Sequence, residues 1–364
     1  MTHALWLLRL AIPLLLAAPT MAAEVRPPAL APEPGPALIG SEGVPLRITG
    51  RVEPLGRFGF THDWPGIYAS ARFEGDRVSI LFDDADSRWE IRVDGGPREI
   101  VDRPGTQAVT LSGLGPGPHD LDMEKLSETA GAVIGVFVPA GGRALTPPPP
   151  RRRQMEFIGD SDMVGFGVES PVRDCTRDEV RALTNTQLGF APRVARAFDA
   201  DYQVMARSGI GLVRNYLGAN PGHEMPMVYR AAPPAGPDWN PGIVVIALGS
   251  NDFTDGVTDQ MALIKTYEDG VIAFAAELQD RYPDSVLIFA TAGDEYEFTD
   301  ATRAALKRLD PARRNRATQV VFPERALTGC YDHPSLADQA TMAKTITDWI
   351  ETNPEIWHAN DTRP

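Results

Sequence analysis

Residues 243–252 read IVVIALGSND, an apolar run that passes directly into a glycine, a serine and two polar residues. A short, nearly unbroken apolar run is typical of a strand that is buried on both faces of a sheet. Similar runs occur at residues 155–158, 202–205, 286–289 and 320–322. Helical patterns lie between them, such as the apolar steps of three and four through residues 264–278. This alternation predicts a parallel α/β sandwich over residues 154–364, with ligands bound at the carboxyl ends of the strands.

Residues 37–146 follow a different pattern. Short runs of alternating apolar and polar residues are separated by turn residues, as in VSILF at 78–82, WEIRV at 89–93 and AVIGVFV at 132–138. Such runs without helical patterns predict an antiparallel β-sandwich of jelly-roll type. The sequence PPPPRRR at 147–153 is interpreted as the linker between the two domains, with its basic triplet in solvent.

The first residues have the pattern of a targeting segment. Residues 5–18 are mostly apolar, and small residues that suit signal peptidase follow them. A membrane anchor is the weaker interpretation, because the apolar run is short and Arg9 and Pro13 interrupt it. We therefore predict a signal peptide over residues 1–23, a Pro-rich linker over 24–36, and a secreted or periplasmic protein that leaves the membrane after cleavage.

The composition narrows the classes of partner. The chain of 364 residues carries 49 acidic and 35 basic side chains, a formal net charge of −14 at pH 7. Such a charge repels nucleic-acid phosphates and anionic lipid headgroups, so we expect neither as a partner. The two cysteines are too few for a disulfide-stapled miniature scaffold, and no Cys and His pairs have the spacing of a zinc site. An uncharged or weakly charged ligand fits better; the sequence predicts no oligomeric state.

Polar motifs lie where the predicted strands end. These motifs are GDSD at 159–162, RSG at 207–209, GSND at 249–252, and CYDHPS at 330–335 before the last helical pattern. Each motif alone is a common turn or helix cap, and Ser335 with Asp338 has the spacing of a capping box. Together and in this order, they supply every group that acyl transfer requires.

Each of these groups has a distinct role in acyl transfer. Ser161 is the candidate nucleophile on a tight turn from strand to helix, and His333 is the candidate general base. The backbone N–H groups of Ser161 and Gly209 and the side-chain amide of Asn251 are the candidate donors of an oxyanion hole. No metal ion and no cofactor is expected.

These motifs also carry a family resemblance. The set GDS at 159–161, Gly209, GSND at 249–252 and His333-Pro334 resembles the four sequence blocks of the SGNH (GDSL-type) hydrolases. With the predicted β-domain and Gly329-Cys330, the chain resembles more narrowly the family-two carbohydrate esterases. The resemblance implies a flavodoxin-like three-layer α/β/α domain behind a jelly roll. It also implies removal of O-acetyl groups from plant-type polysaccharides such as xylan and glucomannan, often at the sugar 6-position.

One position departs from the SGNH pattern. Members of that family commonly carry the third catalytic residue, an aspartate, three residues before the histidine, and here that position is Cys330. The carboxylate normally fixes the tautomer of the imidazole and stabilises its cation. We expect a Ser161–His333 dyad whose imidazole is oriented by a backbone carbonyl. The alternative is that Asp332, the immediate neighbour of His333, curls back to complete a triad.

The two cysteines have two interpretations. Cys330 is either a small buried residue with a free thiol or one half of a disulfide with Cys175, the only other cysteine. A disulfide would tie the segment after the nucleophile to the loop that carries His333, and would thus preorganise the site.

Three functions remain open from the sequence. The leading prediction is a carbohydrate O-acetylesterase acting on an acetylated polysaccharide or oligosaccharide. A second is a lipase-like or thioesterase activity that keeps the serine chemistry on another acyl ester. The third is a noncatalytic glycan-binding protein that has lost its activity together with the aspartate, although the presence of both Ser161 and Asn251 argues against it.

Overall fold

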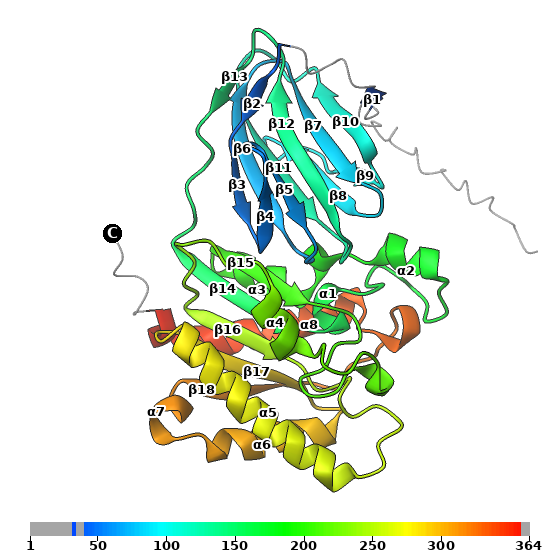
Figure 1. Ribbon diagram of the computed structural model, residues 1–364, viewed down its shortest axis with the longest axis vertical. Helices are drawn as coiled ribbons and strands as arrows, with labels where there is room; N and C mark the ends of the chain where they lie inside the picture. Colours follow the sequence, from blue (N-terminus) through cyan, green and yellow to red (C-terminus); the bar gives the residue numbers. More distant parts are fainter. Residues whose placement is uncertain (1–30, 34–39, 358–364) are drawn as a thin grey trace, which may run out of the picture.

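The computed structural model describes residues 31–33 and 40–357, which form a β-sandwich stacked on an α/β domain (Figure 1). The predicted signal peptide at 1–23 and most of the predicted linker at 24–36 lie outside the described residues. Within the described residues, no helix is long and apolar enough to cross a membrane.

Two antiparallel sheets make up the N-terminal domain. The larger sheet contains β1 (Ala31–Glu33), β10 (Gly105–Ser112), β7 (Arg77–Asp84), β12 (Gly131–Val138), β5 (Gly59–His62) and β4 (Val52–Leu55) in that order, with β2 (Glu42–Val44) paired to β12. The smaller sheet contains β13 (Arg143–Leu145), β6 (Tyr68–Glu74), β11 (Pro118–Lys125), β8 (Arg88–Val93) and β9 (Glu99–Asp102), with β3 (Leu46–Thr49) paired to β6. The predicted β-sandwich is confirmed.

The alternating sequence pattern accounts for the core of this sandwich. In β7, Val78, Ile80 and Phe82 are fully buried because side chains two residues apart share one face of a strand. Trp89 in β8 is also fully buried, and its indole N–H donates to Asp84 Oδ2 at 2.9 Å. Trp89 is therefore a core residue with a satisfied polar atom, as its place in an alternating strand suggests.

The predicted Pro-rich linker at 24–36 needs one correction. Its residues Ala31–Glu33 form the edge strand β1, which pairs antiparallel with β10 and sets Pro32 opposite Val109. Proline is tolerated at the edge of a sheet because one side of an edge strand makes no ladder hydrogen bonds. Proline content alone therefore does not distinguish a tether from an edge strand.

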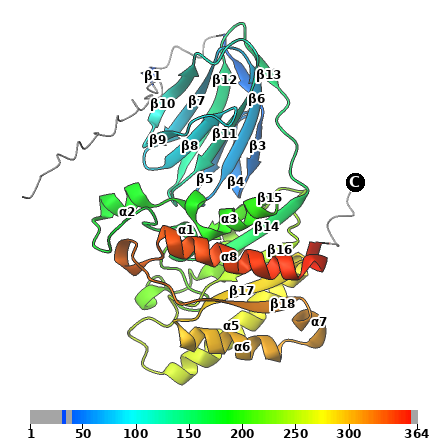
Figure 2. The ribbon, with the colours of Figure 1, turned by 180° about the vertical axis from the view of Figure 1, so that it is seen from behind.

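The C-terminal domain is a five-stranded parallel sheet with helices on both faces (Figures 1 and 2). Its strand order is β15 (Ala200–Ala206), β14 (Arg153–Gly159), β16 (Ile243–Ala247), β17 (Val286–Ala292) and β18 (Ala317–Phe322). One face carries α3 (Phe190–Ala197) and α8 (Leu336–Thr352), and the other carries α5 (Gln260–Arg281) and α6 (Tyr296–Arg308). The shorter helices are α1 (Ser161–Val164), α2 (Arg177–Leu183), α4 (Met225–Ala231) and α7 (Pro311–Arg314). The predicted α/β/α fold is confirmed.

The strand order decides where the polar motifs meet. The chain passes from β14 outward to β15 and then back to β16 on the other side of β14. Such a reversal opens a crevice beyond the carboxyl ends of the strands, because the connections leave in opposite directions. The segments that follow β14, β15 and β16 begin with Asp160, Arg207 and Leu248, and all three start at this crevice.

The two domains share an extensive boundary. One hydrophobic cluster includes Trp64 and Ile67 of the sandwich together with Ile158 and Met205 of the parallel sheet. A buried ion pair joins Arg51 of the sandwich to Glu156 in β14, with 2.7 Å between Nη2 and Oε1. The sandwich is therefore packed directly against the α/β domain, in addition to being connected to it by the linker.

Candidate active site

Ser161 lies at the first turn after β14. Asp160 caps the short helix α1, with its Oδ1 accepting the Asp162 N–H at 3.1 Å. The helix ends after one turn at Gly165, whose φ of 70° favours glycine. Ser161 is therefore presented at the carboxyl end of a central strand, 7% exposed, on a turn fixed at both ends.

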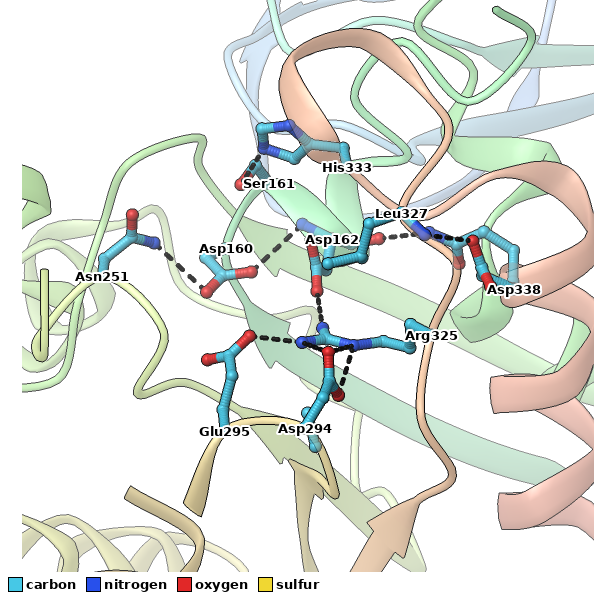
Figure 3. A network of polar contacts seen from close by, with 12 residues as sticks. Asp160, Ser161, Asp162, Asn251, Asp294, Glu295, Arg325, Leu327, His333 and Asp338 are labelled. Carbon is cyan, nitrogen blue, oxygen red and sulfur yellow. Dashed lines mark hydrogen bonds and ion pairs between the residues drawn. The ribbon is translucent and has the colours of Figure 1, made fainter. Parts of the chain in front are cut away.

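The imidazole of His333 lies directly beside this serine (Figure 3). Its Nε2 lies 2.9 Å from Ser161 Oγ. Its Nδ1 lies 2.9 Å from the carbonyl oxygen of Cys330 and 3.0 Å from that of Tyr331. A carbonyl oxygen can only accept, so the neutral imidazole carries its hydrogen on Nδ1 and turns the lone pair of Nε2 to the serine. That tautomer is the one a general base requires.

An unusual backbone holds the two carbonyls in place. Tyr331 and Asp332 have φ angles of 51° and 57°, in the left-handed region that few non-glycine residues adopt. The Tyr331 N–H donates to the Arg173 carbonyl at 2.7 Å, and the ring of Phe166 lies 4.4 Å from that of His333 between centroids. Contacts of this kind are what maintain a strained loop at a functional site.

The structure does not bring Asp332 to the imidazole. Its side chain is 69% exposed, and its Oδ1 lies 3.1 Å from Nε of Arg173. The left-handed backbone at Asp332 directs the carboxylate to this arginine, whereas the Cys330 and Tyr331 carbonyls take the place beside Nδ1. The geometry favours the dyad over the triad with Asp332.

We therefore expect Asp332→Ala to keep kcat/KM for 4-nitrophenyl acetate within about threefold of the wild-type value, because exposed ion pairs contribute little. The measurement is initial-rate kinetics at several pH values. A loss comparable to that of Ser161→Ala would contradict the dyad and restore Asp332 to a triad.

A disulfide joins Cys175 to Cys330 over a sequence separation of 155 residues. It lies against Gly167, where an added Cβ would come within 2.5 Å of the Cys330 Cβ. Gly167 also has a φ of 56°, so two independent constraints favour glycine there. The bridge thus fixes the segment that begins the histidine loop to the segment that follows the nucleophile.

Replacing both Cys175 and Cys330 by serine should lower the free energy of unfolding by about 2–4 kcal/mol, because the unfolded chain regains a long loop. Urea denaturation followed by circular dichroism measures this loss. In the wild-type protein, unfolding without reductant should expose no titratable thiol. An unchanged urea midpoint in the double variant would show that the bridge does not constrain the fold.

The three candidate oxyanion donors lie close together in the fold, because Asn251 bonds to Asp160, the neighbour of Ser161, and to Ile210, the neighbour of Gly209. Within the described residues, neither the Ser161 N–H nor the Gly209 N–H donates to a protein acceptor. The Asn251 amide is engaged: its Nδ2 donates to Asp160 Oδ2 at 3.2 Å and to the Ile210 carbonyl at 2.9 Å. Asn251 can therefore donate to an oxyanion only by giving up or sharing the longer of these bonds.

Asp160 is the partner that decides how firmly Asn251 is held. Burial, and then the negative charge of Asp162, raises the pKa of Asp160 well above its usual range. The Asn251 amide is therefore bonded to a carboxyl group whose charged form is disfavoured by burial and by the neighbouring Asp162.

Comparisons with known proteins identify the family of this chain. Residues 48–149 match the model of the carbohydrate esterase 2 N-terminal family. The chain is 32% identical over 335 residues to an acetylxylan esterase / glucomannan deacetylase of Cellvibrio japonicus, covering 86% of this chain and 92% of the relative. The chain belongs to carbohydrate esterase family 2. It is therefore a serine carboxylic-ester hydrolase.

Solved structures of family-two esterases are similar over nearly their whole length. One from Corynascus thermopiles, solved with a carbohydrate-binding domain, has a TM-score of 0.73 and 28% identity over 84% of this chain and 98% of its own. Another, from Clostridium thermocellum in complex with cellohexaose, has a TM-score of 0.70 and 26% identity over 85% of this chain and 99% of its own. The two-domain arrangement is thus shared within the family.

A buried ionic cluster beneath the dyad of this esterase was not predicted from the sequence (Figure 3). Arg325, only 4% exposed, pairs with Asp162 at 2.6 Å, with Asp294 at 3.1 Å and with Glu295. These residues lie in α1 and in the segments that follow β18 and β17, so all reach the same edge of the sheet. That common edge is the only sequence signal that points to the cluster.

The cluster connects both catalytic groups. Asp162 belongs to the helix that Ser161 begins, and Arg325 starts the segment that leads to His333. Asp338 of α8 accepts the N–H groups of Ala326 and Leu327 at 2.8 and 3.1 Å, and it completes the predicted capping box with Ser335. The nucleophile and the base are therefore fixed to one another through buried charges and backbone hydrogen bonds.

An open cavity of about 660 Å³ adjoins residues 207–211, the oxyanion loop, which follows β15 and contains Gly209. Gly209, Ile210, Tyr216 and His223 line it from the α/β domain, and Asp63 lines it from the sandwich. Both domains therefore contribute to the space beside the candidate oxyanion hole.

Proposed function

We propose that this carbohydrate esterase is a secreted or periplasmic O-acetylesterase that removes acetyl groups from plant-type polysaccharides such as xylan and glucomannan. The observation that carries the proposal is the contact of Ser161 Oγ with His333 Nε2 at 2.9 Å, made while Nδ1 is occupied by two backbone carbonyls. This arrangement supplies a nucleophile and a correctly oriented base without a third side chain.

The first half-reaction forms an acetyl-enzyme. His333 Nε2 takes the proton of Ser161 as Oγ attacks the acetyl carbonyl carbon, and the imidazolium so formed donates from Nδ1 to the two carbonyls. The N–H groups of Ser161 and Gly209 donate to the oxyanion of the tetrahedral intermediate. Collapse of the intermediate breaks the bond to the sugar oxygen, which leaves as an alcohol with the proton from Nε2.

The second half-reaction restores the enzyme. A water molecule replaces the sugar, His333 takes one of its protons, and the resulting nucleophile attacks the acetyl carbonyl. The second intermediate collapses to acetate and free Ser161, whose Oγ regains its proton from His333. The chemistry needs no group beyond the side chains and N–H donors of the site.

Three observations support a neutral glycan as the substrate. A relative at 32% identity is named an acetylxylan esterase / glucomannan deacetylase, and a neighbouring structure at 26% identity holds cellohexaose. The net charge of −14 favours an uncharged chain over a polyanionic carrier.

Secretion is part of the proposal and has its own support. Residues 1–23 have the composition of a signal peptide, and a disulfide between Cys175 and Cys330 persists best outside the reducing cytoplasm. N-terminal sequencing of the protein from the producing cells should find a chain that begins at Glu24. A mature chain that retains residues 1–23 would contradict it.

Acetate release tests the proposed substrate. We expect the wild-type protein to release acetate from acetylated xylan or acetylated glucomannan and to hydrolyse 4-nitrophenyl acetate faster than the butyrate or octanoate ester. A preference for the longer esters, with no acetate from either glycan, would indicate a lipase-like or thioesterase activity instead. Positional analysis of one acetylated oligosaccharide then identifies the hydroxyl that loses its acetyl group.

A further inference from the structure

The oxyanion loop is held by a residue of the other domain. Glu128 lies in the segment that joins β11 to β12 of the sandwich. Its Oε2 accepts the backbone N–H of Ser208 at 2.8 Å, and its Oε1 accepts the Ser208 hydroxyl at 2.5 Å. Ser208 immediately precedes Gly209, whose N–H is a candidate oxyanion donor. One carboxylate therefore binds both donors of the residue next to the oxyanion hole.

The position of Ser208 in the chain explains why its contact with Glu128 affects the Gly209 N–H. The Gly209 N–H belongs to the peptide unit that joins Ser208 to Gly209, so the direction of that N–H follows the backbone of Ser208. The α/β domain holds the rest of the turn: the Arg207 N–H donates to the Gly159 carbonyl at 3.3 Å, and the Tyr216 N–H donates to the Gly209 carbonyl at 2.9 Å. Between these points, Ser208 takes its position from Glu128.

The segment that carries Glu128 is itself fixed. The ammonium group of the fully buried Lys125 donates to the carbonyls of Trp64, at 3.1 Å, and of Thr129. The Leu126 carbonyl accepts the Thr186 N–H of the α/β domain at 2.9 Å. Glu128 is thus presented by a segment that is bonded to both domains, which is the support a positioning group requires.

A second contact between the domains holds the residue before Ser208. The guanidinium of Arg207 lies 4.5 Å from the ring centroid of Trp64 and pairs with Asp63 of the sandwich. Burial raises the pKa of Glu128, while the hydrogen bonds from Ser208 and the positive charges of Arg207 and Lys125 oppose that rise. The net effect raises the pKa of Glu128 above its usual range. Both of its carboxyl oxygens nevertheless act as acceptors, one for the Ser208 N–H and one for the Ser208 hydroxyl.

We propose that Glu128 is a positioning residue for the oxyanion hole, supplied by the β-sandwich to the α/β domain. The sandwich is then part of the catalytic unit. This inference rests on the proposed serine esterase mechanism, in which the Gly209 N–H stabilises the oxyanion. A displacement of about 1 Å at such a donor can lower a rate about 100-fold.

The test compares two variants that remove opposite ends of the contact, Glu128→Ala and Ser208→Ala. We expect kcat for 4-nitrophenyl acetate to fall about 10- to 100-fold in Glu128→Ala and less in Ser208→Ala, which keeps its backbone N–H. KM should change less than about threefold, because the oxyanion forms only after the substrate has bound. Glu128→Gln, which keeps one acceptor oxygen, should recover part of kcat. The double variant should lose less than the product of the two single losses.

Arg47→Met is the matched control, because Arg47 pairs with Asp201 across the same boundary at 2.9 Å but lies away from the oxyanion loop. It should lower the melting temperature without lowering kcat at a temperature where every variant is folded. A wild-type kcat in Glu128→Ala, a change in KM alone, or losses of kcat in Arg47→Met equal to those in Glu128→Ala would each overturn the proposal.

Because the test uses 4-nitrophenyl acetate, a failure of the Glu128 proposal can be distinguished from a failure of the proposed function. 4-Nitrophenyl acetate reports serine esterase chemistry whatever the natural acyl carrier is. Failure to release acetate from glycans would overturn the proposed substrate and leave the comparison of Glu128 variants intact. Equal kcat values for wild-type protein and Glu128→Ala would overturn the positioning role alone.

Discussion

Replacing Ser161 by alanine should lower kcat/KM for 4-nitrophenyl acetate at least about 10⁴-fold while leaving the fold unchanged. The reason is that Ser161 Oγ is the nucleophile that His333 Nε2 contacts, at 2.9 Å, and alanine offers no atom to attack the ester. No other hydrogen bond of the Ser161 side chain is recorded within the described residues, so its loss removes no structural contact. Initial-rate kinetics and thermal unfolding together measure this result.

A serine elsewhere provides the matched control. Ser79 lies in β7 of the sandwich, and among the described residues its hydroxyl bonds only to Thr110, at 2.8 Å. Ser79→Ala should keep the wild-type kcat/KM, since it removes the same atom far from the crevice. Residual activity of Ser161→Ala within tenfold of the wild-type value would show that another group is the nucleophile.

Replacing Arg325 by methionine should have the largest effect on stability, a loss of about 3–5 kcal/mol at pH 8. Arg325 is 4% exposed and pairs with Asp162, Asp294 and Glu295, so its removal leaves three half-buried carboxylates without this cation. Its positive charge lowers the pKa values of Glu295 and Asp160, and both pKa values should therefore rise further in the variant. Urea denaturation at several pH values measures the loss.

The pH dependence of this loss has a definite sign. An acid whose pKa is higher in the folded than in the unfolded protein favours the fold below its unfolded pKa and loses that contribution as pH rises through the folded pKa. The deficit of Arg325→Met should therefore be smaller at pH 5 than at pH 8. Arg308→Met is the control, because Arg308 pairs with Glu268 and Asp269 on an exposed helix surface and should show no measurable deficit. A deficit of Arg325→Met that is independent of pH would contradict this account.

The positions of the candidate catalytic residues were predictable because each lies beside a strand or helix of recognisable pattern. Ser161 and Asn251 come directly after apolar runs that had to be central parallel strands, and the structure places both at one crevice. His333 was predictable from its place before a capped helix. The sequence predicted that a backbone carbonyl would orient the imidazole, but it did not predict which carbonyl. The carbonyls are placed by the left-handed backbone of Tyr331 and Asp332, and residues of these two types rarely adopt that conformation.

Contacts between segments far apart in the chain could not be predicted from the sequence. Glu128 reaches Ser208 only because the sandwich packs against the β15 side of the parallel sheet, and no local pattern encodes that docking. Arg325 similarly pairs with carboxylates from α1 and from the segment after β17, and in the sequence each of these residues resembles an ordinary surface charge. Packing between elements, which local periodicity does not specify, determines both.

Covalent labelling tests the role of the dyad most directly. The wild-type protein, treated with a 4-nitrophenyl phosphonate ester and analysed by peptide mass spectrometry, should carry one adduct, on Ser161. Labelling should be at least about 100-fold slower in His333→Ala and should keep its wild-type rate in Asp332→Ala. An adduct on another residue, or labelling of His333→Ala at the wild-type rate, would contradict the assignment of Ser161 and His333 as nucleophile and base.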